Sequence, residues 1–234
     1  MSMHYQEWAP VYRAIRADFG YSIEDDRRAR DRLATLLEGT THGSLPDWTG
    51  QPVAVAGAGP SLDRERAIAD RAAVVVAASD AAARLESAGV AVDFMVSDLD
   101  KVPRTVVQRT HSGRPVAIHA HGDNCDLLER WIPECDPEFV VPTTQAEPTE
   151  TVANFGGFTD GDRAAFLADH CGASGLLLVG WDFDDPSLTP VKRRKLAWAE
   201  RLLRLLEIRR GERFSALDGR RSEIDTTALP VDSE

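Results

Sequence analysis

Two carboxylates, one residue apart, end the apolar run VAVDFMV in the segment SDLD at residues 97–100. Asp98 and Asp100 share a face if the chain stays extended, because alternate side chains of a strand point the same way. A divalent cation relieves their repulsion, and Mg²⁺ prefers such oxygen ligands when it presents the phosphates of a nucleotide. SDLD therefore predicts a metal site, with a solvated turn as the alternative.

A second polar segment, HAHGDN at residues 119–124, ends another apolar run. We expect Asp123 to complete a magnesium site with Asp98 and Asp100. His121 or Asn124 then contacts phosphate or the attacking hydroxyl group. A histidine packed in the core is the structural alternative.

The segment GAGPSL at residues 57–62 predicts a nucleotide-binding turn. Gly57 and Gly59 allow backbone N–H groups to approach a phosphate, and Ser61 is placed to cap the next helix. The sixth residue is leucine where the dinucleotide fingerprint requires glycine or alanine, so a dehydrogenase is not indicated. Asp80, at the end of the next run, is placed to bind a ribose. An ordinary Gly-Pro-Ser turn is equally compatible with these residues.

A glycine turn precedes a helix in NFGGFTDGDRAAFLADHCG, residues 154–172. Thr159 is the expected N-cap, with Asp162 as its capping-box partner. The open backbone before the helix and a cation in its first turn form a candidate anion site. The candidate substrate-binding residues here are Gly156, Gly157, Asp160 and Arg163, and Asp160 is also a candidate metal ligand.

The last apolar run ends in GWDF, which makes Asp182 another candidate substrate-binding residue. A helix expected at 189–208 follows, with a basic cluster in its first turns. Lys192, Arg193 and Lys195 are a candidate clamp for the phosphates of ATP, and a solvated basic face is the alternative.

These motifs are positioned by short apolar runs that alternate with helical stretches. Such continuous runs suit strands covered on both faces, and predict an α/β fold with a mostly parallel sheet flanked by helices. In such sheets ligands bind at the carboxyl ends of the strands, so the motifs should converge on one crevice. The expected strands are 53–56, 73–79, 93–99, 115–121, 138–142 and 176–183.

Three segments are expected along the chain. Residues 1–45 form an N-terminal helical layer with helices at 4–18 and 24–38, residues 46–217 form the catalytic domain, and residues 218–234 form a flexible tail.

Composition excludes several function classes. The 234 residues carry a formal net charge of -11, which argues against a nucleic-acid surface. The sequence predicts neither a targeting segment nor a membrane-spanning run, and the three cysteines lack a zinc or disulfide pattern, so we expect a cytoplasmic protein. The acidity fits either a salt-adapted cytosol or an ordinary acidic surface. A homodimer is compatible with this architecture.

The ordered set GAGPSL, SDLD, HAHGDN, NFGGFTDGDRA, GWDF and KRRKL, within residues 53–208, resembles the archaeal 6-hydroxymethyl-7,8-dihydropterin pyrophosphokinases, which are related in fold to thiamine pyrophosphokinases. The resemblance implies a thiamine-pyrophosphokinase-like catalytic domain and Mg²⁺-dependent pyrophosphoryl transfer from ATP to the pterin, in folate or tetrahydromethanopterin biosynthesis. It also implies that Asp98, Asp100 and Asp123 surround the metal and the triphosphate, with His121 and Asn124 nearby.

Other functions remain open at this point. Thiamine is disfavoured as the acceptor because Lys101 follows SDLD where thiamine pyrophosphokinases often have serine, and because no second β domain is evident after residue 208. GAGPSLD is also similar to the nucleotide-binding loop of some glycosyltransferases, and a non-catalytic nucleotide-binding module is a third interpretation. For the pterin ring, Phe155, Phe158 and Trp181 are the candidate walls, unless they belong to the core.

Overall fold

The computed structural model describes residues 3–231 and contains a six-stranded parallel sheet. The spatial order is β5-β4-β3-β2-β1-β6, so the chain builds the sheet outward from β1 in one direction and then returns to add β6 on the other side of β1. The strands are β1 Pro52–Ala56, β2 Val74–Ala78, β3 Phe94–Ser97, β4 Val116–Ala120, β5 Val140–Thr144 and β6 Gly175–Val179.

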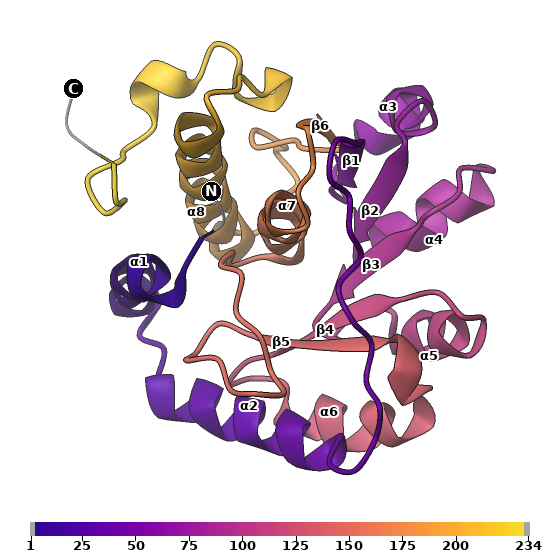
Figure 1. Cartoon of the computed structure of the whole chain (residues 1–234). Helices are drawn as coiled ribbons and strands as arrows, with labels where there is room; N and C mark the ends of the chain where they lie inside the picture. Colours follow the sequence, from indigo (N-terminus) through magenta and orange to yellow (C-terminus); the bar gives the residue numbers. More distant parts are fainter. Residues whose placement is uncertain (1–2, 232–234) are drawn as a thin grey trace.

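Helices cover both faces of the sheet (Figure 1). One face carries α1 Tyr5–Phe19, α7 Asp160–His170 and α8 Pro190–Arg210. The opposite face carries α2 Ile23–Leu36, α3 Leu62–Ala69, α4 Asp80–Ser87, α5 Pro103–His111 and α6 Cys125–Trp131. Short 3₁₀ turns lie at Ile132–Glu134, Pro137–Phe139, Ser215–Leu217 and Arg221–Glu223.

The strands are apolar throughout because successive residues enter two different cores. In β1, Val53 and Val55 pack toward α7 and α8, whereas Ala54 and Ala56 pack toward α3 and its neighbours. Burial on both faces is the condition that produces continuous apolar runs in a parallel sheet. The expected α/β class is therefore confirmed.

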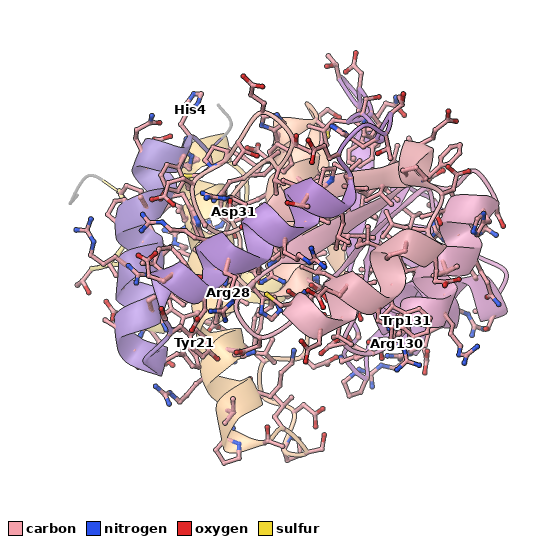
Figure 2. All side chains as sticks on the ribbon, turned by 90° about the horizontal axis from the view of Figure 1, so that it is seen from below. His4, Tyr21, Arg28, Asp31, Arg130 and Trp131 are labelled. Carbon is pink, nitrogen blue, oxygen red and sulfur yellow. The ribbon has the colours of Figure 1, made fainter. Side chains whose placement is uncertain are left out.

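The two N-terminal helices are present, but they belong to opposite faces of the sheet. Trp8 and Ile15 of α1 lie in the core with α7 and α8, whereas Leu33 of α2 packs with Leu128 of α6. Figure 2 shows α2 lying alongside α6, with Arg28 and Asp31 on its outer side. The described part of the N-terminal segment, residues 3–45, thus contributes to both layers.

The tail differs from the expected flexible segment wherever it is described. Leu217 and Leu229 are buried in the core that contains α8, and Arg221 binds the buried carboxylate of Glu207 in that helix. Apolar contacts therefore hold the chain as far as Val231, and residues 232–234 lie outside the described part. Within residues 3–231, no helix is both long and apolar enough to cross a bilayer.

Candidate active site

A cavity of about 680 Å³ lies at the carboxyl ends of the strands. It receives residues from the segments that follow β1, β2, β3, β4 and β6, and is closed by the α1–α2 turn and the first turns of α7 and α8. The predicted residues that line it are Gly57, Gly59, Asp98, Asp100, His121, Asp123, Asp160, Arg163, Asp182, Lys192 and Lys195. The sequence motifs therefore converge as the parallel sheet requires.

Three carboxylates form a compact cluster in this cavity. One oxygen from each of Asp98, Asp100 and Asp160 lies within 4.8 Å of the others. Asp160 is the first residue of α7, so the start of that helix lies close to Asp98 and Asp100 at the end of β3. Hard oxygen donors in this arrangement suit Mg²⁺. Asp123 lines the same cavity but is not part of this cluster among the described residues.

A left-handed residue, rather than an extended strand, brings Asp98 and Asp100 together. Strand β3 ends at Ser97, and Leu99 has a φ of 70° with its side chain fully buried. The Ser97 hydroxyl accepts the Leu99 N–H at 3.1 Å, and Asp98 Oδ1 accepts the Asp100 N–H at 3.3 Å. A non-glycine residue in this region costs about 1 kcal/mol or more, and such strain gathers at functional sites.

The acids of the cluster have displaced pKa values. Burial and the charge of Asp98 raise the pKa of Asp160 to about 8, and burial together with Asp98 raises that of Asp100 to about 6. Burial acts to raise the pKa of Asp98 too, but the hydrogen bond from His121 and the charge of Arg163 lower it well below its usual range. The cluster therefore gathers more negative charge than its surroundings neutralise, and a cation would relieve this repulsion.

Arg163 is the cation that the protein itself supplies. Its side chain is only 7% exposed and its Nη1 lies 3.0 Å from Asp160 Oδ1 and 3.9 Å from Asp98 Oδ2. The other guanidinium arm donates to Gln145 Oε1 at 3.1 Å. Arg163 therefore orders two carboxylates of the cluster.

His121 and Asn124 position the cluster from β4. His121 Nε2 lies 3.4 Å from Asp98 Oδ2, while His121 Nδ1 accepts the Asp123 N–H at 3.3 Å. This pairing assigns the ring proton to Nε2. The Asn124 amide donates to the carbonyls of Asp98 and His119 and accepts the His121 N–H. Asn124 is 98% buried, does not line the cavity, and links the segments that follow β3 and β4; its predicted contact with the nucleotide stays a prediction.

The glycines of GAGPSL allow the loops after β1 and β6 to pack closely. The Gly57 and Gly59 N–H groups donate to the carbonyls of Val179 and Gly180, and the Ser61 N–H donates to Asp182 Oδ2. A Cβ atom at Gly57 would lie 2.6 Å from the Gly180 oxygen. These three donors already have partners within the protein, while Gly57 and Gly59 line the cavity, so a phosphate-binding role for this turn stays a prediction. Ser61 holds the N-cap position of α3, but its hydroxyl makes no capping bond.

The turn before α7 also differs from its predicted role. Thr159 and Asp162 form the expected capping box. Gly156 and Gly157 lie behind the helix, against Phe166 and the backbone of Arg163, and neither lines the large cavity. Close packing and positive φ values at both positions account for glycine here, and a direct contact with substrate stays a prediction.

Helix α8 contributes to the cavity two of the three basic residues that were predicted to bind the phosphates of ATP. Lys192 and Lys195 line the cavity, whereas Arg193 is exposed outside it and donates to the Leu188 carbonyl. Burial and the nearby charge of Lys101 lower the pKa of Lys192. Lys101 also lines the cavity, so three lysines face the same space as the acids.

Aromatic side chains line the cavity on two sides. Trp181 lies between Gly57 and Gly161 and donates its indole N–H to the Val55 carbonyl. Phe158 lies on another side, near Tyr21 and Lys195. Phe155 is outside the cavity and packs against His170, so its expected role in the pterin slot is corrected.

Two functional candidates, Asp26 and Gln145, were not identified from the sequence. Both are buried and line the cavity, and Gln145 Nε2 donates to Asp26 Oδ1 at 3.0 Å. They are 119 residues apart. No local motif marks such a long-range pair, and its only signal in the sequence is an acid inside an amphipathic helix.

A family model described as 6-hydroxymethylpterin diphosphokinase MptE-like matches residues 29–187. The matched region contains the three acids of the cluster and every strand of the sheet.

Three curated archaeal proteins named 6-hydroxymethyl-7,8-dihydropterin pyrophosphokinase are similar over most of the chain. The protein from Pyrococcus furiosus is 38% identical over 88% of this chain and 95% of its own length. The protein from Methanothermobacter thermautotrophicus is 37% identical, covering 88% and 96%. The protein from Methanocaldococcus jannaschii is 33% identical, covering 77% and 80%.

Proposed function

Because the chain belongs to the MptE-like 6-hydroxymethylpterin diphosphokinase family, we propose that it transfers a pyrophosphoryl group from ATP to 6-hydroxymethyl-7,8-dihydropterin. The hydroxymethyl oxygen forms a bond to the β-phosphorus of ATP, and the bond from that phosphorus to the oxygen bridging the α-phosphate breaks. AMP leaves, the pterin gains the β- and γ-phosphates, and the hydroxyl proton is released to water. The product serves folate or tetrahydromethanopterin biosynthesis.

The observation that carries this proposal is the cluster of Asp98, Asp100 and Asp160 in a cavity that also holds three lysines. Phosphoryl transfer depends mainly on positioning and charge neutralisation. Bound Mg²⁺ would neutralise charge on the transferred phosphates. Its expected ligands are these three acids, which replaces the earlier set in which Asp123 was the third ligand.

The remaining side chains act on charge and orientation. Lys101, Lys192 and Lys195 bind phosphate oxygens of ATP, and Arg163 keeps Asp98 and Asp160 in register. His121 is a positioning residue in this scheme, because its Nδ1 already accepts a backbone N–H and its Nε2 faces Asp98. It has no free lone pair with which to remove the proton of the acceptor.

The names of the matched family and of the relatives also bear on the alternative functions. A nucleotide-sugar transferase or a thiamine pyrophosphokinase also needs a nucleotide site, but the matched family and the three relatives all carry pterin names, which supports a pterin as the acceptor. The free thiols of Cys125, Cys135 and Cys171 support the expected cytoplasmic location.

The test is to incubate the protein with ATP, Mg²⁺ and either 6-hydroxymethyl-7,8-dihydropterin or thiamine, and to identify the products by mass spectrometry. The proposal predicts AMP and pterin diphosphate in equal amounts, with no thiamine diphosphate. Formation of ADP or of thiamine diphosphate would contradict the proposal, and so would the absence of both AMP and pterin diphosphate. Stabilisation by a nucleotide sugar alone would favour the glycosyltransferase.

A further inference from the structure

The turn between α1 and α2 and the turn after β4 both line the cavity, and they contribute Tyr21 and Asp123. Resting on the proposed function, we infer that this side of the cavity, lined by Tyr21, Phe158 and Asp123, binds the pterin acceptor, and that the side formed by the β1 and β6 loops binds the adenosine part of ATP.

The in-line geometry of the transfer requires the acceptor and AMP to lie on opposite sides of the transferred phosphates. The attacking and leaving oxygens lie roughly in line on either side of the β-phosphorus. The acceptor and AMP must therefore approach the phosphates from opposite directions. The acid cluster includes Asp98 and Asp100 at the end of β3, and in the sheet order β4 lies on one side of that strand and β2, β1 and β6 lie on the other.

The β1–β6 side has the features of an adenosine site. In open α/β sheets, ligands bind where consecutive connections leave in opposite directions, which here is between β1 and β6. Trp181 supplies an aromatic wall, and Asp80 and Asp182 line the cavity with carboxylates that accept hydrogen bonds from ribose hydroxyls. The N–H groups of Gly57, Gly59 and Ser61 in the β1 loop already have partners, which favours the uncharged part of ATP over its phosphates at these three residues.

The β4 side has the features of a pterin site. Phe19 stacks on one face of the Tyr21 ring with 5.2 Å between ring centroids, and Phe158 lies 6.4 Å from Tyr21. These rings form a rigid aromatic wall for a flat heterocycle. Tyr21 lies in the turn between α1 and α2, and the first turns of α8 lie near this wall, because Arg194 stands over the Phe19 ring and Lys195 over the Phe158 ring.

Asp123 supplies the polar recognition on that side. The amino group and the neighbouring ring N–H of a pterin are adjacent donors, and one carboxylate accepts both. Adenine instead places an acceptor nitrogen beside its amino group, which a carboxylate repels. Burial and then the charge of Asp123 raise the pKa of the Tyr21 hydroxyl, in keeping with the proximity of these two side chains. This role also accounts for Asp123 lying in the cavity without belonging to the acid cluster.

The acceptor side is held in place before any substrate arrives. Asp26 of α2 accepts the Gly122 N–H at 2.9 Å, and a Cβ atom at Gly122 would lie 2.7 Å from Cβ of Asp25. The turn that carries Asp123 is thus fastened to the helix that follows Tyr21. Preorganisation of this kind lowers the entropic cost of binding.

Binding without turnover tests this assignment. The affinities of oxidised 6-hydroxymethylpterin, measured by its fluorescence, and of α,β-methylene-ATP, measured by calorimetry, are compared in the wild type and in single variants. Tyr21→Leu and Asp123→Asn should each weaken pterin binding about tenfold and change binding of the ATP analogue less than twofold. Tyr21→Phe keeps the ring and should bind pterin within twofold of the wild type.

Trp181→Phe and Asp182→Asn supply the reverse comparison, and should weaken binding of the ATP analogue while leaving the pterin unaffected. The inference is overturned if the Tyr21 and Asp123 variants weaken the ATP analogue instead, or if they bind pterin as the wild type does. Circular dichroism and melting temperature verify folding. Failure of the folded wild type to bind any pterin would overturn the proposed function as well, which separates the two conclusions.

Discussion

Asp26 Oδ1 accepts the backbone N–H of Gly122 at 2.9 Å, and thereby joins the second helix of the chain to the turn after β4. The same oxygen accepts Gln145 Nε2 at 3.0 Å, and Gln145 Oε1 accepts Arg163. One carboxylate therefore supports two arms that both end at Asp98, one through His121 and one through Arg163. The N-terminal helices are in this way coupled to the catalytic geometry.

Replacing Asp26 by Asn should lower kcat by about 10- to 100-fold, because small displacements of positioned groups have effects of that size. Glu207→Gln is the matched control, since Glu207 is also a buried carboxylate, with Arg204, Arg221 and the Phe214 N–H as partners. Both variants should lose about 1–3 kcal/mol of unfolding free energy. Equal kcat values in the two variants would show that Asp26 acts only on stability.

Metal affinity should rise with pH. Asp100 and Asp160 have pKa values of about 6 and about 8 in the absence of metal, and a cation binds their deprotonated forms. Between pH 6 and 8 one proton is displaced, so the association constant for Mn²⁺ should increase about tenfold per pH unit, then level off. Calorimetry in two buffers of different ionisation enthalpy measures both the affinity and the proton release. A constant affinity over this range would contradict the raised pKa values.

Asp160→Asn should stabilise the metal-free protein at alkaline pH. The pKa of Asp160 is raised from 3.8 to about 8, so the folded state retains a proton that the unfolded chain releases. The stability contributed by that proton is present at low pH and is lost as the pH rises through about 8. The melting temperature of the variant relative to the wild type should therefore increase by a few degrees from pH 5 to pH 8.5. A difference in melting temperature that stays constant or becomes smaller over this pH range would contradict the expected direction.

Gly57→Ala should separate the loops after β1 and β6, because its Cβ atom would meet the Gly180 oxygen at 2.6 Å. The expected loss is about 1–3 kcal/mol of unfolding free energy in urea denaturation. Gly175→Ala, in β6, is the matched control, since no heavy atom lies within 4 Å of its added Cβ. The close-packing role of Gly57 would be wrong if both substitutions were tolerated equally.

The sequence predicted the sheet and the convergence of its polar ends, because both follow from local patterns. Continuous apolar runs mark strands buried on both faces, and parallel strands necessarily bring Asp98 and Asp182 to one edge. Local pattern could not predict which donors find partners across the fold. The N–H of Gly59 donates to the carbonyl of Gly180, just after β6, and the N–H of Ser61 donates to Asp182, 121 residues away. The spacing within GAGPSL does not indicate either bond.

For a related reason, the sequence could not predict which acids form the cluster. Asp123 was the predicted partner of Asp98 and Asp100, and Asp160 only a further candidate, since each of the two begins or precedes a helix after a strand. Which of the two joins the cluster depends on two features of the fold. Leu99, with its φ of 70°, turns Asp100 back toward Asp98, and α7 packs against β1, β2 and β3. Neither the left-handed leucine nor the helix docking has a local signature.

The central claim is tested most directly by the Mg²⁺ dependence of pterin-dependent AMP formation in the wild type, Asp160→Asn and Asp123→Asn. The account predicts no AMP in EDTA, a half-saturating Mg²⁺ concentration at least about tenfold higher in Asp160→Asn, and an unchanged one in Asp123→Asn. AMP formation without a divalent cation, or a loss of Mg²⁺ affinity in Asp123→Asn but not in Asp160→Asn, would contradict it.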